Sequence, residues 1–173
     1  MNVIQSGELP REALLGKYQQ DGAYTDCYFI DIPRAVSQAA YVEAFYTTKL
    51  FKVERLILAL LAQRPSTDAQ AKLLALGEAQ KFAAWSVEGR TPDQLLLCDF
   101  LGSTRSWLMS AVSKDGDSSS TRLYFGSAVV PKIDRASGRA SFGIAFHLLG
   151  GFHRLYSRAL LRSASSRLRH SAR

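Results

Sequence analysis

Apolar and polar residues follow two different periods along this chain, and the changes of period mark its elements. Residues Tyr24 to Ile32 alternate polar with apolar or aromatic side chains and end at Pro33, which predicts a β-strand. From Arg34 to Ala62 the apolar residues instead recur every three or four positions. That spacing predicts helix, and the β-branched pair Thr47 and Thr48 predicts a break within it.

A shorter helix and four strands are predicted next. Pro65 to Asp68 can end the preceding helix and cap the start of the next one. That next helix is predicted over Ala69 to Leu76 and can end at Gly77. The four strand candidates are separated by turn-forming residues and span Phe82 to Glu88, Gln94 to Leu101, Arg105 to Val112, and Arg122 to Val130. Because most of the connections are short, neighbouring strands are expected to pair antiparallel as a meander.

A long amphipathic helix is predicted from Phe142 onward. Its apolar residues follow the spacing of a packed face, and they are Leu148, Leu149, Phe152, Leu155, Tyr156, Ala159 and Leu160. Arg154, Arg158 and Arg162 occupy the other side of the helix at steps of four. One face is therefore expected to be buried and the other to be cationic.

The order of elements predicts the fold class. An antiparallel sheet with one apolar face needs a cover, and the closing helix has the length to lie across it. We therefore expect an α+β fold of the helix-grip type, in which a curved antiparallel sheet with short helices packs on a long C-terminal helix. A single domain over residues 21–164 is expected, after an N-terminal segment (1–20) and before a basic C-terminal tail (165–173).

Three stretches carry a resemblance to a known family. They are Tyr24-Thr25-Asp26-Cys27-Tyr28, Leu97-Cys98-Asp99-Phe100, and the closing-helix segment from Phe152 to Arg162. With this order of elements, the chain resembles the START and Bet v 1-like superfamily (SRPBCC-type domains). It is similar to a bacterial family of helix-grip proteins without an agreed activity, also seen as a C-terminal appendage to short-chain dehydrogenase-like proteins. The resemblance implies a cavity between sheet and helix. Leu101 stands where the family often has an arginine.

Charge is distributed unevenly along the chain. Lysine and arginine number 22 against 15 acidic residues, and no acid follows Asp134. The arginines of the closing helix are expected to form a solvated face, or to meet the headgroups of an anionic membrane surface. Nucleic acid is the least favoured partner, because no binding motif is visible and no exposed aromatic residues alternate with the arginines.

The sequence favours a cytoplasmic location. Glu8, Pro10, Arg11 and Glu12 interrupt the apolar run that a signal peptide requires. The longest apolar stretch, Leu56 to Ala62, is much shorter than the roughly 18 residues that a membrane-spanning helix needs.

Catalytic and metal-binding signatures are weak. Asp26 and Asp99 could divide acid and base work in a cavity. Alternatively, Asp26 could cap or bond the adjacent backbone while Asp99 pairs with Arg105 or another strand cation. Cys27 and Cys98 are expected to be buried reduced thiols. No metal-ligand spacing, phosphate loop or nucleophile elbow occurs, so neither a metal nor a cofactor is expected and an enzyme is disfavoured.

These observations predict a binding protein for a small apolar or amphipathic molecule. The residues expected to contact it are Asp26, Tyr28, Trp85, Asp99, Trp107, Tyr124, Phe152 and Tyr156. The aromatic residues among them could instead be ordinary core. One alternative is a non-catalytic interaction module that places Arg154, Arg158 and Arg162 on an anionic surface or partner protein; another is a cyclase-like or isomerase-like enzyme. An empty, enclosed pocket of roughly 300 Å³ or more would favour ligand binding, whereas a sheet filled by its own side chains would favour the interaction module.

Overall fold

The fold is described from a computed structural model of the 173-residue chain, covering residues 3–61, 63, 65–112, 120–133, 140–141 and 144–170. For residues 57–61, 132–133, 140–141 and 144–153 it describes the backbone alone. Within these ranges, no helix combines the length and the apolar character needed to cross a membrane.

Seven antiparallel strands form one open sheet in the order β1-β2-β7-β6-β5-β4-β3. They are β1 (Gln5–Ser6), β2 (Tyr24–Ile32), β3 (Lys81–Phe82), β4 (Trp85–Thr91), β5 (Gln94–Asp99), β6 (Thr104–Val112) and β7 (Thr121–Val129). The predicted opening strand and the predicted antiparallel meander are both confirmed. A separate hairpin pairs β8 (Lys132–Ile133) with β9 (Ala140–Ser141).

Five helices complete the described fold: α1 (Gly16–Gln20), α2 (Gln38–Tyr46), α3 (Lys49–Leu61), α4 (Asp68–Leu76) and α5 (Ile144–His170). The predicted break at Thr47 and Thr48 is confirmed. Thr47 Oγ1 donates to Glu43 O at 2.6 Å, and Thr48 Oγ1 accepts from Phe51 N at 3.1 Å, so each hydroxyl satisfies a backbone group at a helix end.

The predicted stop signals around the next helix are also confirmed. Thr67 forms a capping box with Gln70 at the start of α4. Gly77 ends that helix with φ of 85°, a left-handed conformation that glycine adopts without steric cost.

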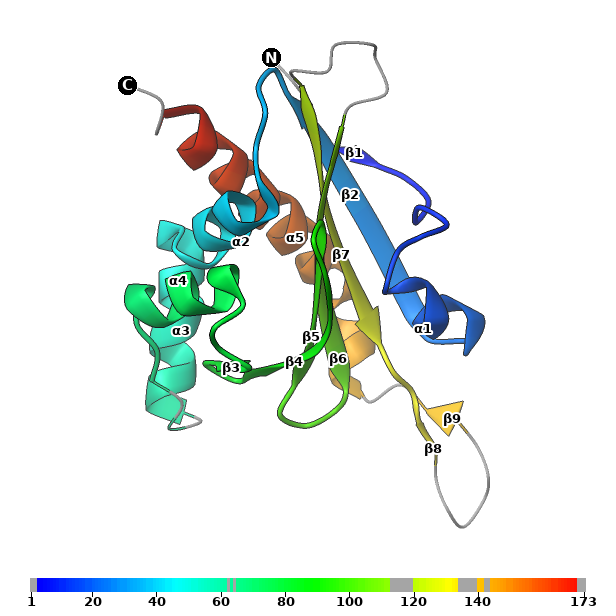
Figure 1. The fold of residues 1–173 in the computed structure, drawn as a ribbon. Helices are drawn as coiled ribbons and strands as arrows, with labels where there is room; N and C mark the ends of the chain where they lie inside the picture. Colours follow the sequence, from blue (N-terminus) through cyan, green and yellow to red (C-terminus); the bar gives the residue numbers. More distant parts are fainter. Residues whose placement is uncertain are drawn as a thin grey trace.

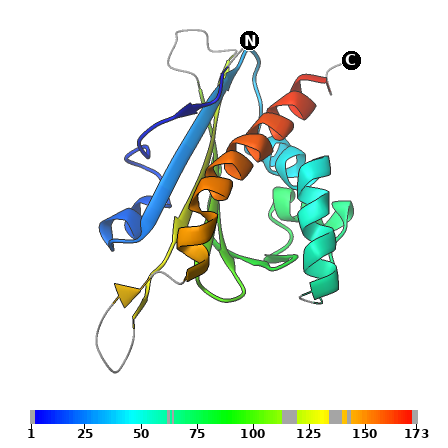
Figure 2. The ribbon, with the colours of Figure 1, turned by 180° about the vertical axis from the view of Figure 1, so that it is seen from behind.

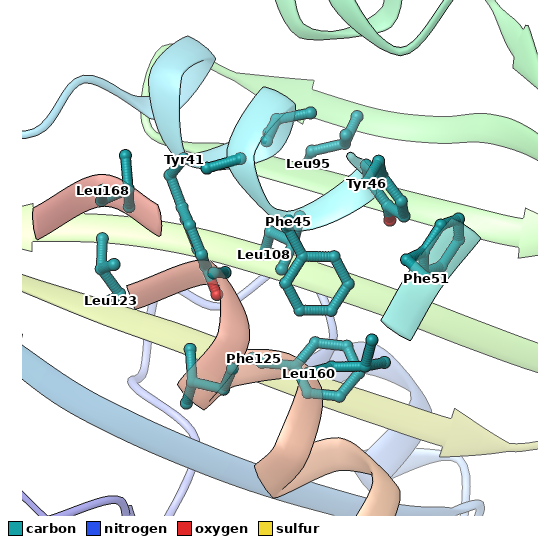
Figure 3. Close-up of a cluster of buried hydrophobic side chains, with 14 of the residues drawn as sticks. Tyr41, Phe45, Tyr46, Phe51, Leu95, Leu108, Leu123, Phe125, Leu160 and Leu168 are labelled. Carbon is teal, nitrogen blue, oxygen red and sulfur yellow. The ribbon is translucent and has the colours of Figure 1, made fainter. Parts of the chain in front are cut away.

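Helices α2 to α5 cover one face of the sheet, and the N-terminal segment with α1 covers the other (Figure 1). Seen from behind, α5 crosses the sheet beside α2 and α3 (Figure 2). The main core lies under these helices, where the rings of Phe45 and Phe125 approach to 4.9 Å between centroids. Figure 3 shows them with Leu160 of α5.

The opposite face has a second core around Trp107, Leu15 and Tyr124. Gln94 ties the N-terminal segment to it: its Oε1 accepts from Leu14 N and Trp107 Nε1, both at 2.9 Å, and its Nε2 donates to Glu12 O at 3.0 Å. The sheet is thus buried on both faces, whereas the sequence analysis expected only one of its faces to be covered.

α5 extends through residues 165–170, which the sequence analysis assigns to a tail. Leu168 is 4% exposed and belongs to the main core. Arg167 Nη1 donates to Thr47 O at 2.9 Å. These contacts fix the end of the helix against the region between α2 and α3.

Candidate functional site

A pocket of about 700 Å³ lies between the sheet, α3 and α5. Residues at the end of α2 and along α3 form one wall, the strands form the floor, and α5 forms the third side. The described lining residues are Phe45, Leu50, Phe51, Val53, Glu54, Trp85, Thr104, Arg105, Ser106, Phe125, Ser127, Ala128, Val129, Leu155, Tyr156, Ser157, Ala159 and Leu160. Because Val53 and Leu155 line the pocket and are also exposed, they lie at its mouth.

The pocket is apolar along most of its surface. Phe45, Phe51 and Phe125 are nearly fully buried, and they form its inner end together with Leu160. Such a surface gains free energy by excluding water, at roughly 25 cal/mol for each Å² of apolar surface covered. An apolar molecule is therefore the occupant that this wall favours.

A hydrogen bond joins the two helices that border the pocket. The hydroxyl of Tyr156 on α5 donates to Glu54 Oε2 on α3. Burial, together with the neighbouring Glu54 carboxylate, raises the pKa of Tyr156 well above its ordinary value. The hydroxyl therefore stays protonated and remains a donor near neutral pH.

Two polar atoms of the lining residues lack a hydrogen-bond partner. They are the Ser157 hydroxyl on α5 and the Trp85 indole N–H on β4, and both atoms are buried. Ser157 as a whole is 1% exposed. Buried polar groups in native proteins nearly always have a partner, so these two donors are exceptions, and both are closed off from the open space of the pocket.

Arg105 belongs to the lining, but its charge is used on the other face of the sheet. Its Nε lies 2.6 Å from Glu88 Oε2 and 2.8 Å from the hydroxyl of Tyr18. The guanidinium also lies 4.6 Å from the centre of the Tyr18 ring. The Arg105 guanidinium therefore links α1 to the sheet through Tyr18 and Glu88.

Of the predicted ligand contacts, the structure brings Trp85 and Tyr156 into the lining. Tyr28 faces the helices but is buried under the guanidinium of Arg158, 5.5 Å from its ring centre. Asp26 Oδ1 accepts from Ser127 N at 2.9 Å and from Ser127 Oγ at 2.7 Å. Asp26 therefore bonds the neighbouring strand. This is the structural role that the sequence analysis gave as the alternative to acid–base catalysis.

Asp99 holds a turn. Its Oδ1 accepts from the backbone N–H groups of Ser103 at 2.7 Å and Thr104 at 3.0 Å, which fixes the connection between β5 and β6. Arg105, one of the cations that the sequence analysis offered as a partner for Asp99, pairs with Glu88 instead.

Two predicted aromatic contacts lie on the far side of the sheet. Trp107 and Tyr124 pack in the second core, with ring centres 6.0 Å apart, because successive residues of a strand point to opposite faces. The sequence analysis could not assign them to a face without knowing that the N-terminal segment covers one. The predicted contact at Phe152 lies outside the described side chains.

The packed face of α5 differs from the predicted one. Leu160 is buried, but Leu155 is 70% exposed and Ala159 is also exposed. The buried stripe instead contains Ser157, Leu160, Leu161, Ala164, Ser165 and Leu168. α5 packs against α2 and β2, and the exposed residues Leu155 and Ala159 belong to the pocket lining. Leu148 and Leu149 lie outside the described side chains.

Arg154, Arg158 and Arg162 of α5 are all exposed, and the first two lie beside β2. Arg158 lies over Tyr28 of β2, and Arg154 donates a hydrogen bond to Tyr24, which raises the pKa of Arg154. Arg162 is exposed. Contact of these residues with an anionic surface stays a prediction.

The two cysteines are free thiols in different surroundings. Cys27 is buried, and burial raises the pKa of its thiol to about 12. Cys98 is half-buried rather than buried as predicted, because it lies near one end of β5 on the face that α1 covers only in part. Among the described residues, no three His, Cys, Asp or Glu side chains gather where they could hold a metal ion.

Several lining residues were not singled out from the sequence, among them Phe51, Glu54 and Ser157. One signal was available: Glu54 and Ser157 are polar residues that interrupt apolar helical faces. Comparisons with protein-family models, with curated proteins and with solved structures give no match to this chain.

Proposed function

We propose that this protein binds a small apolar or amphipathic molecule in the pocket between the sheet, α3 and α5. The observation that carries the proposal is a pocket of about 700 Å³ with a wall of buried aromatic and aliphatic side chains. Ligand sites typically occupy roughly 300 to 1,000 Å³ and are mainly apolar, with a few placed polar groups.

The order and pairing of the elements support a helix-grip assignment. β2 is followed by helices and then by a meander whose last strand, β7, returns to lie beside β2. The chain then continues into the long helix that borders the pocket. In this architecture the space between sheet and closing helix is the natural place for a ligand.

The surroundings of the aspartates favour binding over catalysis. Asp26 and Asp99 each accept a backbone N–H, and neither belongs to the described lining of the pocket. Glu54 is the carboxylate among the described lining residues, and the hydroxyl of Tyr156 already occupies one of its oxygens. A pair of carboxylates facing one substrate is thus not formed by these residues.

The proposal is tested by native mass spectrometry of freshly purified protein and by titration with a fluorescent hydrophobic probe. We expect a co-purified small molecule or saturable binding of one probe per chain. Ala159→Trp should block binding, because residue 159 lines the pocket and is exposed, so the larger side chain enters the empty space. Ser166→Trp is the matched control at an exposed position of α5 outside the lining. Absence of saturable binding to the folded parent would overturn the proposal.

A further inference from the structure

Two contacts set how α3 and α5 lie relative to one another. Tyr156 donates its hydroxyl to Glu54 within α3, and Arg167 near the end of α5 donates to Thr47 O, just before α3 begins. The later residue of α5 thus meets the earlier position in the chain, so the two helices run antiparallel. Figure 2 shows both on the same side of the sheet. The start of α3 therefore lies beside the second half of α5.

Exposed apolar side chains flank the open mouth of the pocket. Val53 on α3 and Leu155 on α5 line the pocket and are 56% and 70% exposed. Leu56, which is 59% exposed, follows Val53 by one turn on the same face of α3. Single exposed apolar residues are common, but a group of them beside a pocket is typical of a surface that another molecule covers.

Cations lie on the same two helix faces. Lys49 precedes Val53 by one turn of α3 and is exposed. Arg162 follows Leu155 by two turns of α5 and is also exposed. Because the helices are antiparallel, Lys49 and Arg162 come to the same end of the shared surface. Glu54 is the single acid in the sequence of these two helices, and it is half-buried. The surface therefore has an apolar part at the mouth and a cationic part beside it.

A bilayer with anionic lipid is the occupant that fits both parts. Apolar side chains gain free energy by entering the boundary between headgroups and acyl chains, and cations gain free energy among anionic headgroups. A second copy of the chain fits less well, because a two-fold contact would bring the same cations together without acids to balance them. A bilayer is also a place where apolar molecules are held out of water.

We propose that the mouth of the pocket docks onto a bilayer that contains anionic lipid. Val53, Leu56 and Leu155 enter the boundary between headgroups and acyl chains, and Lys49 and Arg162 lie among the headgroups. In this orientation the pocket opens toward the bilayer, so an apolar ligand moves between the two without entering water. The passage of a ligand rests on the proposed binding function, whereas the docking rests on the exposed residues of α3 and α5.

Co-sedimentation with vesicles near neutral pH tests the docking. The vesicles are phosphatidylcholine alone, or an equal mixture of phosphatidylcholine and phosphatidylglycerol. We expect binding to the mixed vesicles that weakens as salt rises, and weaker binding to phosphatidylcholine alone, because salt screens the attraction between exposed charges. Binding to soluble polyglutamate but not to the mixed vesicles would point to an acidic partner protein and overturn the proposal, as would binding to neither.

Apolar variants locate the docking surface. Leu56→Glu and Leu155→Glu should each weaken binding to the mixed vesicles about tenfold or more, because each removes an apolar contact and adds a charge that the lipid repels. Val112→Glu is the matched control: Val112 is 68% exposed and lies at the other end of β6 from the lining residue Thr104. It should bind as the parent does. Parent-like binding by both Leu56→Glu and Leu155→Glu would overturn the proposal.

A cation pair tests the charged part of the surface. Arg162→Gln should weaken binding to the mixed vesicles about fivefold, as expected for one basic residue near anionic lipid. Arg11→Gln removes an exposed cation from the N-terminal segment, which covers the opposite face of the sheet, and should change binding less. Equal losses in the two variants would mean that net charge alone attracts the protein, and the proposed orientation would be wrong.

Titration of the parent with the fluorescent hydrophobic probe, without vesicles, separates this inference from the binding function. If the probe binds and the mixed vesicles do not, the docking fails and the binding function stands. If the mixed vesicles bind and the probe does not, the binding function fails and the docking surface stands. Binding of both, with the losses expected for Leu56→Glu and Arg162→Gln, supports the two together.

Discussion

The hydroxyl of Tyr156 on α5 donates to the carboxylate of Glu54 on α3, so one side-chain pair links the two helices that border the pocket. Tyr156→Phe removes the donor and keeps the ring. A hydrogen bond to a charged group contributes roughly 1.5 to 3 kcal/mol, and partial exposure of this pair reduces that figure. We expect the free energy of unfolding in urea to fall by about 1 to 2 kcal/mol. Glu54→Gln, which keeps an acceptor oxygen, should lose less; a Tyr156→Phe variant as stable as the parent contradicts the link.

Leu160 and Leu155 allow a matched test of how α5 is oriented. Leu160 is 3% exposed and Leu155 is 70% exposed. Leu160→Ala should lower the free energy of unfolding by about 2 to 5 kcal/mol, because it leaves a cavity in the core. Leu155→Ala should change it by less than about 0.5 kcal/mol. Similar losses in chemical denaturation would show that the helix is rotated from the orientation described.

Gln94 should control the attachment of the N-terminal segment. Gln94→Leu leaves the buried indole N–H of Trp107 and the backbone of Glu12 and Leu14 without this partner. We expect a loss of about 2 to 4 kcal/mol and faster tryptic cleavage after Arg11 and Lys17. Gln20→Leu, at an exposed position of α1, is the control and should do neither. Unchanged cleavage in Gln94→Leu would mean that the segment is held by its apolar contacts alone.

Two glycines should respond oppositely to alanine. A Cβ at Gly126 would lie 2.8 Å from the backbone oxygen of Asp26 and 2.9 Å from the Trp107 ring, so Gly126→Ala should cost about 2 to 3 kcal/mol. A Cβ at Gly16 meets nothing within 4 Å, so Gly16→Ala should be neutral or stabilising by up to about 1 kcal/mol. Thermal denaturation compares the two. A tolerated Gly126→Ala would place the second core further from β7 than described.

The two thiols should react at different rates. A thiol reacts through its thiolate, and burial keeps Cys27 protonated near neutral pH by raising its pKa to about 12. Cys98 is half-buried and more accessible. A chromogenic disulfide reagent should therefore modify Cys98 first, and Cys98→Ser should remove the faster phase. In denaturant both thiols should react together. A fast phase that survives Cys98→Ser is incompatible with a buried Cys27.

Local pattern predicted most of the elements, because their signals lie within a few residues. The alternation over Tyr24 to Ile32 matches β2, and Thr48 caps the helix that starts beside it. Turn chemistry between the later strands also predicted their antiparallel pairing. Each of these features depends on neighbours in the chain.

The site was harder to predict because it depends on which face of an element is covered. Trp85 and Trp107 are both aromatic residues on strands, yet one lines the pocket and the other lies behind the sheet. A signal of the second cover was present: the run Leu95-Leu96-Leu97 is buried on alternate sides, as in strands that are covered on both faces. On α5, Leu155 has the spacing of a core residue but faces a space that no described side chain fills.

The cover on the back of the sheet also determines how the pocket can admit a molecule. Leu15 and Trp107 pack behind the same strands that form the pocket floor, so a strand cannot retreat from a ligand without breaking those contacts. The far end of α5 is anchored by Leu168, whereas Leu155 lies in its pocket-facing half and is exposed to solvent. The pocket is already open at its mouth beside Val53 and Leu155, so any widening is left to α3 and to that half of α5. For the proposed ligand, the strands would set where its inner end rests, and the two helices would set how bulky the rest of it can be.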